Sequence, residues 1–356
     1  GVIVHWAKDA QEFNEIAYSI LAEHNVKKLV KSKSMLTEEC EMNKYLIAKG
    51  IDVVETDLGE RILQLMNLKP AHIVVPAAHI TRDEVGELFE KDGISKDIGN
   101  HDPTYLTQCA RYSLRQEFIE ADAGMTGCNF GVASTGDCVV CTNEGNADMS
   151  TSIPKLHIVS MGIDKVIPNY DALAVFQRLL ARSATGQPSV SFTSQFRKAR
   201  PGAEMHVILV DNGRSNIIAD QLHWRTAKCI RCGACMNTCP VYRRSMGYSY
   251  NYFIPGPIGI NLGMVHNPKK HSGNVSACSL CLSCDLVCPV KVAPGSQIYY
   301  WRQALEGFGT DNKEKKYMSV AMTELYQHPA IYSVATKYAH FANIIPQKMM
   351  DVKLNT

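Results

Sequence analysis

Apolar and polar positions follow two periodicities along the first two thirds of the chain. Short β-rich runs alternate with longer stretches whose apolar residues have helical spacing. Strands that alternate with helices are typical of a parallel sheet covered by helices. We therefore expect residues 1–221 to form an α/β domain of three layers with a mainly parallel sheet. The predicted strands are Lys28–Val30, Ile51–Val54, His72–Val75, Asp137–Thr142, Leu156–Ser160 and His206–Val210.

Capping and helix-breaking residues delimit the helices between these strands. The polar turn Lys31–Ser34 leads to a predicted helix start at Thr37, and Gly50 ends that helix as the residue after its C-cap. Thr81 and Glu84 have the spacing of a capping box, which predicts a helix start there. Two further helices are predicted over 104–120 and 171–182.

The pattern changes near residue 222, where strand signals end and cysteines become frequent. We expect a mainly helical domain over 222–300 and a helical tail over 301–356. The tail carries apolar residues on one helical face. Packing on the chain's own domain and contact with a partner or a membrane surface both explain such a face. The face consists of Ile331, Val334, Ala335, Tyr338 and Ala342.

Composition excludes several classes of protein. Of the 356 residues 46% are hydrophobic and 20% charged, which suits a packed core and not a disordered chain. The net charge is +2, so nothing indicates a nucleic-acid partner. No stretch approaches the roughly 18 apolar residues of a transmembrane helix, and Gly1–Trp6 has no signal-peptide pattern. We expect a cytoplasmic protein with reduced thiols.

Thirteen cysteines are present, and eight of them form two copies of one spacing, each followed by proline. A C-x₂-C-x₂-C turn with a fourth cysteine before proline is the ligand pattern of [4Fe–4S] clusters. Where two runs occur, the fourth cysteine of each ligates the other cluster. We therefore expect two [4Fe–4S] clusters in a helical ferredoxin-like domain. The first takes Cys229, Cys232, Cys235 and Cys288, and the second takes Cys278, Cys281, Cys284 and Cys239.

Two zinc sites built from C-x₂-C pairs are the alternative explanation of these runs, although zinc needs no third cysteine at this spacing. Cys138 and Cys141 lie in a predicted strand, where positions i and i+3 face opposite sides, which argues against a shared metal or a disulfide. We expect the five remaining cysteines to act as small buried hydrophobic residues. They are Cys40, Cys109, Cys128, Cys138 and Cys141.

Small and polar residues gather at predicted strand ends in the first domain. Open α/β sheets bind ligands at the carboxyl edge, and Lys31–Ser34 before a helix could hold an anion. Ordinary turn chemistry is the competing explanation, because the same residue types dominate turns. No nucleotide-binding or serine-hydrolase motif is present, so neither function is indicated, and catalytic residues are not assigned. The candidate cleft comprises Lys31, Ser32, Ser34, Asp122, Gly124, Thr126, Thr135, Gly136, Glu144 and Asn146.

Nearly the whole chain resembles the lactate utilisation protein B family, the iron–sulfur subunit of the bacterial L-lactate utilisation system. The resemblance implies a LUD domain, related in fold to sugar-phosphate isomerases and CoA transferases, ahead of the two-cluster module. It is carried by the paired cysteine runs together with Lys31–Ser34, ADAGMTGCNFGVASTGD (121–137), TNEGN (142–146) and DNGRSN (211–216).

This resemblance implies electron transfer from L-lactate oxidation to a partner or a quinone-linked acceptor. The chain would be a non-catalytic or co-catalytic subunit of an L-lactate dehydrogenase-type oxidoreductase. The implied partners are a cysteine-rich subunit and a smaller LUD protein, and peripheral membrane contact is compatible with this role. Alternatively, the LUD cleft itself binds a hydroxy acid or an acyl or phosphate compound, with the clusters as its electron outlet. A zinc-stabilised scaffold without redox function is a third hypothesis.

Overall fold

The computed structural model describes residues 1–308 and 313–338. Residues 1–303 form one compact unit and residues 304–356 a second, and each is considered by itself.

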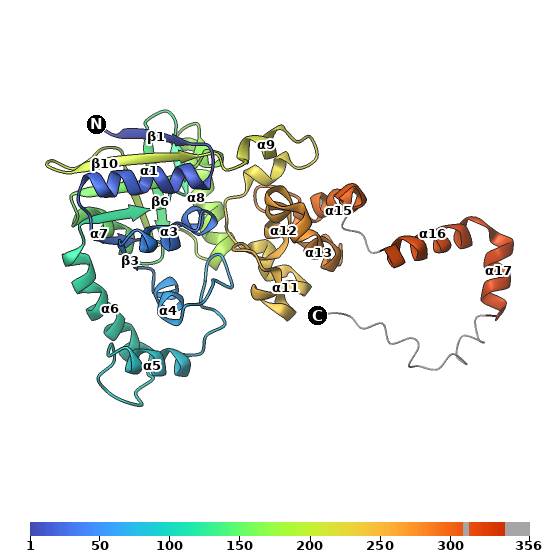
Figure 1. The fold of residues 1–356 in the computed structure, drawn as a ribbon, viewed down its shortest axis with the longest axis horizontal. Helices are drawn as coiled ribbons and strands as arrows, with labels where there is room; N and C mark the ends of the chain where they lie inside the picture. The colour runs from blue at the N-terminus through green and yellow to red at the C-terminus, as the bar shows by residue number, and fades with distance from the viewer. Residues whose placement is uncertain (309–312, 339–356) are drawn as a thin grey trace. The chain divides into compact units, whose positions relative to one another are not determined.

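A six-stranded sheet lies at the centre of the α/β part of the first unit (Figure 1). Its spatial order is β1-β10-β7-β4-β2-β3, and all neighbouring strands run parallel. This arrangement confirms the predicted α/β class. The strands are β1 (Ile3–Ala7), β2 (Lys28–Lys31), β3 (Asp52–Glu55), β4 (Ala123–Thr126), β7 (Leu156–Gly162) and β10 (Glu204–Val210).

A smaller four-stranded sheet, in the order β8-β5-β6-β9, lies beside the large one. Strand β6 is antiparallel to both its neighbours, while β5 and β8 are parallel. Its side chains share a buried cluster with the large sheet, since Cys138 packs with Val159 and Val207. The strands are β5 (Phe130–Val132), β6 (Asp137–Thr142), β8 (Val166–Ile167) and β9 (Phe192–Phe196).

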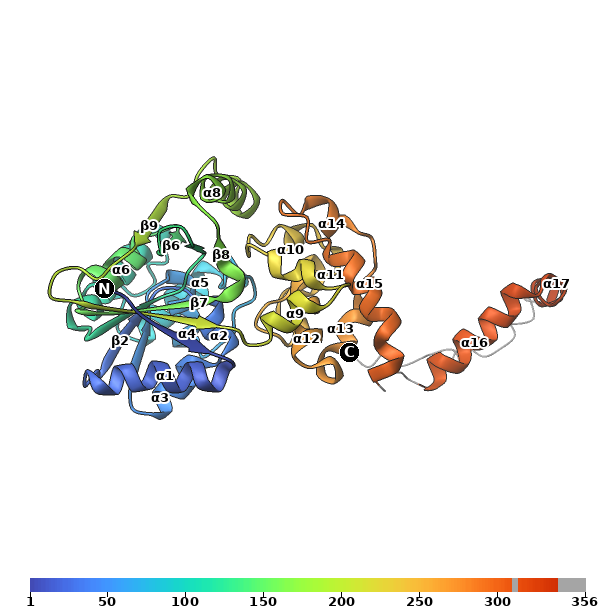
Figure 2. The ribbon, with the colours of Figure 1, turned by 90° about the horizontal axis from the view of Figure 1, so that it is seen from above.

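Helices cover both faces of the large sheet (Figure 2). Successive strand residues face opposite sides, so Leu29 packs with Phe13 of α1 while Val30 packs with Phe118 of α6. The helices of this part are α1 (Ala10–Glu23), α2 (Met35–Glu39), α3 (Met42–Ala48), α4 (Leu58–Met66), α5 (Arg82–Lys91), α6 (Pro103–Glu120), α7 (Asn146–Ser152), α8 (Tyr170–Thr185) and α9 (Arg214–Ala219).

The helix expected from Thr37 to Gly50 is two helices. It starts earlier, at Met35, because the side chain of Ser34 caps α2. The chain then breaks at Glu41, whose φ is +49°, and the carbonyl of Cys40 accepts a hydrogen bond from Asn14 of α1. Gly50 follows Lys49, the C-cap of α3, with φ +84°, which confirms the predicted end. The capping box at the start of α5 is also confirmed.

The strand expected at His72–Val75 does not form. The backbone N–H groups of Val74 and Val75 donate to Nδ1 of His72 instead of to a neighbouring strand. The carbonyl of Ala71 accepts from the Tyr242 hydroxyl, far along the chain. Local and tertiary contacts therefore occupy backbone N–H and carbonyl groups that would otherwise hydrogen-bond to a neighbouring strand. Residues 69–79 are called the docking segment below.

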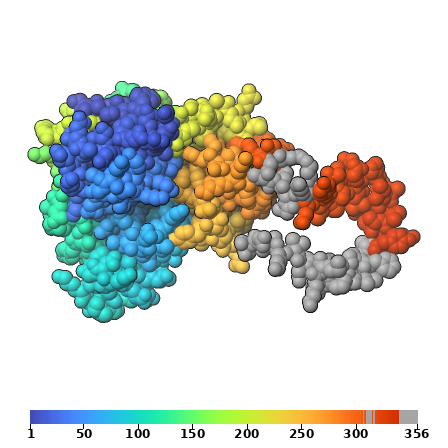
Figure 3. Space-filling view, viewed as in Figure 1, coloured from blue at the N-terminus to red at the C-terminus, as the bar shows by residue number. Residues whose placement is uncertain are grey.

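The rest of the first unit consists of helices and the loops between them, and no strand lies among the described residues after 222. This outcome confirms the predicted helical module. In Figure 3 its atoms, yellow and orange, meet the blue and cyan atoms of the α/β part directly. The helices are α10 (Ala234–Thr238), α11 (Pro240–Ser245), α12 (Gly256–His266), α13 (Pro268–Ala277), α14 (Ser283–Val287) and α15 (Pro294–Ala304).

The second unit contains α16 (Lys313–Gln327) and α17 (Pro329–Tyr338). Ile331, Val334 and Tyr338 of the predicted apolar face are 53%, 58% and 54% exposed, and Ala342 lies outside the described residues. Packing on the chain's own domain and contact with a partner or a membrane surface therefore both stay predictions for this face. Over 1–308 and 313–338, no helix combines the length and the apolar character needed to cross a membrane.

Candidate iron–sulfur and ligand sites

The two cysteine runs adopt the same backbone conformation. In each run the second and the fourth residue after the first cysteine have positive φ. These residues are Arg231 (+61°) and Gly233 (+78°) in the first run, and Leu280 (+52°) and Leu282 (+59°) in the second. Three of the four are not glycine, so the turns hold a conformation that ordinary side chains disfavour. A repeated unfavourable turn indicates a repeated binding task.

Backbone amides of these loops donate hydrogen bonds to cysteine sulfur. Hydrogen bonds to sulfur are one of the means by which a protein tunes an iron–sulfur cluster. The small residues at Gly233 and Ala234 leave the amides room to approach. The donors and their N···Sγ distances are Arg231 to Cys229 (3.4 Å), Leu280 to Cys278 (3.5 Å) and Val292 to Cys288 (3.2 Å).

One small cavity is lined by cysteines of both runs. Cys229, Cys232 and Cys235 of the first run meet Cys288 of the second at its wall. The rest of the wall is largely apolar and includes Ile258 of α12. Four sulfurs around an apolar cavity are the donor set that a [4Fe–4S] cluster requires, so the residues fit the group.

The other cysteines influence one another electrostatically. Burial, followed by the charges of Cys239 and Cys281, raises the pKa of Cys278. Burial also raises the pKa of Cys284 to about 12, and the neighbouring Asp285, then Cys278 and Cys239, add to that shift. Cys239 of the first run is therefore close to cysteines of the second.

Two short helices hold the runs together. Helices α10 and α14 each contain the third cysteine of a run. The hydroxyl of Thr238 in α10 lies 2.5 Å from the hydroxyl of Ser283 in α14. The carboxylate of Asp285 accepts hydrogen bonds from the backbone N–H groups of Gly295 (2.5 Å) and Ser296 (3.0 Å). Asp285 thereby joins the second run to the first turn of α15.

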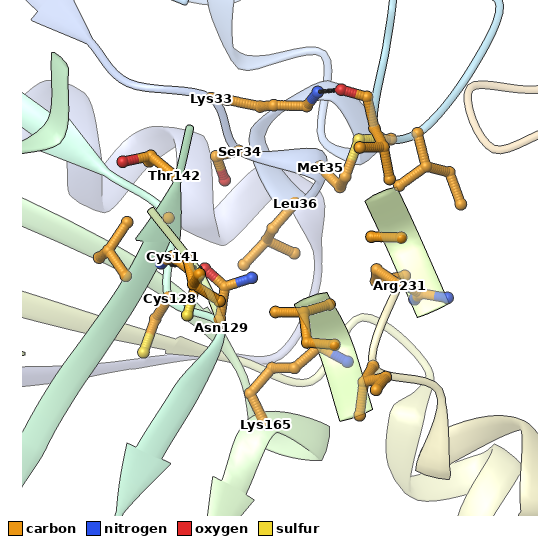
Figure 4. Close-up of a pocket in the computed structure, with 18 of the residues that line it drawn as sticks. Lys33, Ser34, Met35, Leu36, Cys128, Asn129, Cys141, Thr142, Lys165 and Arg231 are labelled. Carbon is orange, nitrogen blue, oxygen red and sulfur yellow. Dashed lines mark hydrogen bonds between the residues drawn. The ribbon is translucent and has the colours of Figure 1, made fainter. Parts of the chain in front are cut away.

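A second, larger cavity of about 190 Å³ lies at the carboxyl edge of the parallel sheet (Figure 4). Residues that follow β2, β4 and β7 line it, as expected for ligand sites in open α/β sheets. Its wall includes Lys33, Ser34, Leu36, Gly127, Cys128, Asn129, Cys141, Thr142, Ser160, Asp164, Lys165 and Arg214.

The first cysteine run forms part of this wall. Ile230 and Arg231, which lie between Cys229 and Cys232, line the large cavity, and Ile230 also lines the small one. Ile73 of the docking segment lines both cavities as well. The ligand-sized cavity of the α/β part and the cysteine cavity are thus separated by two isoleucine side chains.

Paired charges stabilise the floor of the large cavity. Arg214 binds Glu39 (Nη2···Oε2 2.8 Å) and Asp164 (Nε···Oδ1 2.7 Å). Lys165 contacts Asp164 at 2.6 Å and donates to the carbonyl of Cys229 at 2.8 Å. Burial opposes ionisation of Asp164, but Lys165 and Arg214 outweigh it and hold its pKa below the usual range. Burial lowers the pKa of Lys165.

The structure brings only Ser34 of the ten candidate cleft residues to this wall. Lys31 is fully buried below it, with its ammonium 2.7 Å from Glu55 and 3.2 Å from Glu38. Burial works to lower the pKa of Lys31, but the two carboxylates outweigh it and the pKa is raised. Ser32 is buried as well, and its hydroxyl has no hydrogen-bond partner among the described residues.

Three candidates of strand β4 and its start serve the fold. Asp122 lies at the amino end of the strand, opposite the cavity, where it accepts hydrogen bonds from the N–H groups of Lys27 and Lys28. Gly124 lies against helix α7, because a Cβ there would stand 1.6 Å from the carbonyl oxygen of Ser150. The hydroxyl of Thr126 lies 2.9 Å from Nε2 of His157.

The remaining four lie in turns and caps. Thr135 and Gly136 (φ +76°) form the tight turn between β5 and β6, and the Thr135 hydroxyl donates to Asp137. Asn146 is buried at the start of α7. Glu144 accepts from the N–H of Leu58, and burial followed by the charge of Asp57 raises its pKa to about 6. For most of the ten, turn or packing chemistry explains the residue type.

Lys33 lies in the Lys31–Ser34 turn that the sequence offers as an anion site, but sequence reasoning missed the other charged residues of the cavity and two of its cysteines. Cys128 and Cys141 line the wall, whereas Cys40 and Cys138 are buried in hydrophobic clusters. The signals for Arg214 were its place four residues after a predicted strand, at the carboxyl edge, and its place in DNGRSN (211–216), one of the segments that carry the family resemblance. The position of Arg231 in a cysteine run gave no signal of a role in the other domain.

Two family models match the chain. The LUD domain matches residues 1–211 and the 4Fe-4S dicluster domain matches residues 225–292. The paired cysteine runs therefore belong to a module for two [4Fe–4S] clusters.

The similarity of this chain to known proteins extends over both domains. Lactate utilization protein B of Oceanobacillus iheyensis is 39% identical over 351 residues, which cover 96% of this chain and 73% of that protein. Its namesake from Shouchella clausii is 42% identical over 301 residues, covering 82% of this chain and 62% of that one. The uncharacterized electron transport protein YkgF of Escherichia coli is 38% identical over 342 residues, covering 94% and 71%. With its LUD domain and its dicluster domain, the chain belongs to the lactate utilization protein B family.

Proposed function

We propose that this chain is the iron–sulfur electron-transfer subunit of a complex that oxidises L-lactate to pyruvate. The pair of matching cysteine loops in a dicluster domain carries this proposal, and the names of the relatives supply the substrate. The chain is cytoplasmic and passes electrons to a partner subunit or a quinone-linked acceptor. The partners are a cysteine-rich subunit and a smaller LUD protein. The chain divides into a LUD domain (1–221), the electron carrier (222–300) and a tail (301–356).

Each cluster takes three ligands from one run and the fourth from the other. The mixed lining of the small cavity and the influence of Cys239 on Cys278 and Cys284 support this exchange. Cluster 1 binds Cys229, Cys232, Cys235 and Cys288, and cluster 2 binds Cys278, Cys281, Cys284 and Cys239.

A bound [4Fe–4S] cluster supplies a one-electron carrier. The protein's own residues prepare its surroundings. Backbone amides donate to the sulfurs, and Ile73, Ile230 and Ile258 exclude water from the cysteine cavity. Hydrogen bonding and exclusion of water are the levers that set the reduction potential.

A second function is favoured by the large cavity. Its position at the carboxyl edge of the sheet, beside the first cysteine loop, suits a ligand site whose electrons leave through the clusters. In this form of the proposal the LUD domain binds a hydroxy acid or an acyl or phosphate compound.

The ligand exchange predicts different iron contents for two double variants. Cys229→Ala with Cys288→Ala removes two ligands of one cluster, so about four of the eight irons stay bound. Cys229→Ala with Cys239→Ala damages both clusters and leaves almost no iron. The control, Cys40→Ala with Cys109→Ala, keeps about eight. Iron analysis and EPR after anaerobic dithionite reduction measure these contents, and the reverse order of the first two variants would contradict the exchange.

L-Lactate should reduce the clusters when both partner subunits are present. The measurement is the EPR signal of anaerobically purified complex after addition of L-lactate, with dithionite as the full-reduction reference. Clusters that dithionite reduces and L-lactate does not would refute the pathway. Zinc in place of iron would refute electron transfer altogether.

A further inference from the structure

Two cationic side chains of the large cavity form no ion pair at contact distance among the described residues. The ammonium of Lys33 donates to the carbonyl of Val74 at 2.9 Å and forms no ion pair. Nη1 of Arg231 is buried without a hydrogen-bond partner within residues 1–308 and 313–338, and the carboxylates of Asp164 and Glu39 attract the guanidinium without pairing with it directly. A buried charged donor without a partner is costly, so such a group indicates that something absent from the chain itself completes it.

The other charges of the wall cancel one another. Arg214 and Lys165 are bound to Glu39 and Asp164 in the network described above. Asp57 is the one further carboxylate of the lining, and its side chain caps helix α4. Four cationic and three acidic side chains line the cavity, which leaves one positive charge in excess. A single excess charge suits a monoanion better than a phosphate dianion.

The wall also offers a neutral hydrogen-bond donor. Oδ1 of Asn129 accepts from the backbone N–H of Cys141 at 2.9 Å, which fixes the orientation of the amide. Its Nδ2 donates to no atom of the described residues and remains available to a ligand oxygen. Much of the remaining wall is apolar, with Leu36, Val140 and Leu180 among its residues.

We propose that this cavity binds a small organic carboxylate, with Arg231 and Lys33 holding the carboxylate and Asn129 donating to an oxygen on the neighbouring carbon. A 2-hydroxy or 2-oxo acid carries both groups. Arg231 lies between two proposed ligands of cluster 1, Cys229 and Cys232, so the bound acid lies beside that cluster's loop. The inference rests on the proposed function for the identity of the neighbouring cluster, whereas the binding itself does not depend on electron flow.

Calorimetric titration of the anaerobic, cluster-loaded protein with L-lactate tests the site. We expect saturable binding of L-lactate, and binding at least tenfold weaker for its neutral amide and for inorganic phosphate. Arg231→Gln removes a charged hydrogen-bond donor and should weaken L-lactate binding about ten- to a hundredfold. Arg244→Gln, an exposed arginine of the same domain, should leave it within twofold.

The Arg231 variant could lose its cluster, so Lys33→Gln provides a second test of the site. Lys33 lies outside the cysteine runs. Its substitution should weaken L-lactate binding about tenfold while the iron content stays at the wild-type level. Unchanged affinity in Lys33→Gln, or equal binding of L-lactate and its amide, would overturn the inference. If L-lactate binds as expected but never reduces the clusters with partners present, the proposed function fails and the carboxylate site stands.

Discussion

Glu144 illustrates how burial gives a turn residue an unusual protonation equilibrium. The sequence suggests a polar cleft residue, but the carboxylate lies against the start of α4, where it accepts from the N–H of Leu58. Burial and the nearby Asp57 raise its pKa to about 6. The folded protein therefore holds this proton more tightly than the unfolded chain. Its stabilising effect is complete below about pH 4.5 and is lost as the pH rises through about 6.

Glu144→Gln should therefore change the pH dependence of stability. At pH 8 the variant avoids a buried carboxylate and should be more stable than wild type by about 1–2 kcal/mol, allowing for the partial exposure of the group. Near pH 5 this advantage should shrink. Unfolding midpoints of the cluster-loaded proteins at both pH values provide the measurement, with the exposed Glu87→Gln as control. A pH-independent difference would contradict the assignment.

Short helices do most of the positioning in the dicluster domain. Helices α10 and α14 have five residues each, too few to be stable alone, so their contacts hold them. Asp285 is central to this arrangement because its carboxylate caps the start of α15 from within the second cysteine run. A change in α15 is thereby coupled to the ligands of the second cluster.

Asp285→Ala should loosen one cluster and not the other. The variant loses hydrogen bonds to Gly295 and Ser296, a local cost of about 2–3 kcal/mol. About half of the iron should then pass to a chelator at least tenfold faster than in wild type. The exposed Asp92→Ala is the matched control and should release iron at the wild-type rate. Uniform release of all iron would show that the effect is global.

On the scale of the whole molecule, the docking segment joins the two domains of the first unit. The hydroxyl of Tyr242 donates to the carbonyl of Ala71 at 2.7 Å in a buried position. Gly247 approaches the same carbonyl so closely that a Cβ would lie 2.2 Å from its oxygen. Ile230 and Cys232 are buried with side chains of β5, β6 and α8. The first cysteine loop is therefore part of the α/β core.

Tyr242→Phe should weaken this junction, since it leaves the Ala71 carbonyl buried without a donor. The expected cost is about 1–3 kcal/mol, seen as a lower unfolding midpoint of the cluster-loaded protein. Tyr248→Phe removes hydrogen bonds between an exposed hydroxyl and both the carbonyl of Lys69 and Nε2 of His79, where water replaces the lost partner. That variant should lie within about 0.5 kcal/mol of wild type. Equal losses in both variants would show that burial of the Tyr242 bond is unimportant.

The sequence by itself determined the strand and helix alternation, the helical second domain and the paired cysteine runs. These features follow from local periodicity, capping residues and ligand spacing, which act over a few residues. The sequence-based prediction of a strand at His72–Val75 is wrong. This apolar run looks like a strand, but its backbone groups make the contacts that dock the helical domain. Of the candidate cleft residues that the sequence singled out, the structure brings only Ser34 to the wall of the large cavity, because turn residues and ligand residues share the same amino-acid types.

Only the tertiary structure decided which charges meet at the carboxyl edge of the sheet. Arg214 and Arg231 come from segments far from β2 and β4 along the chain, and no local pattern connects them. Cys288 is different, because the paired cysteine spacing alone predicts its place beside the first run. Spacing along the chain fixes which residues can bind metal together, whereas packing between the two domains places a ligand-sized cavity next to them.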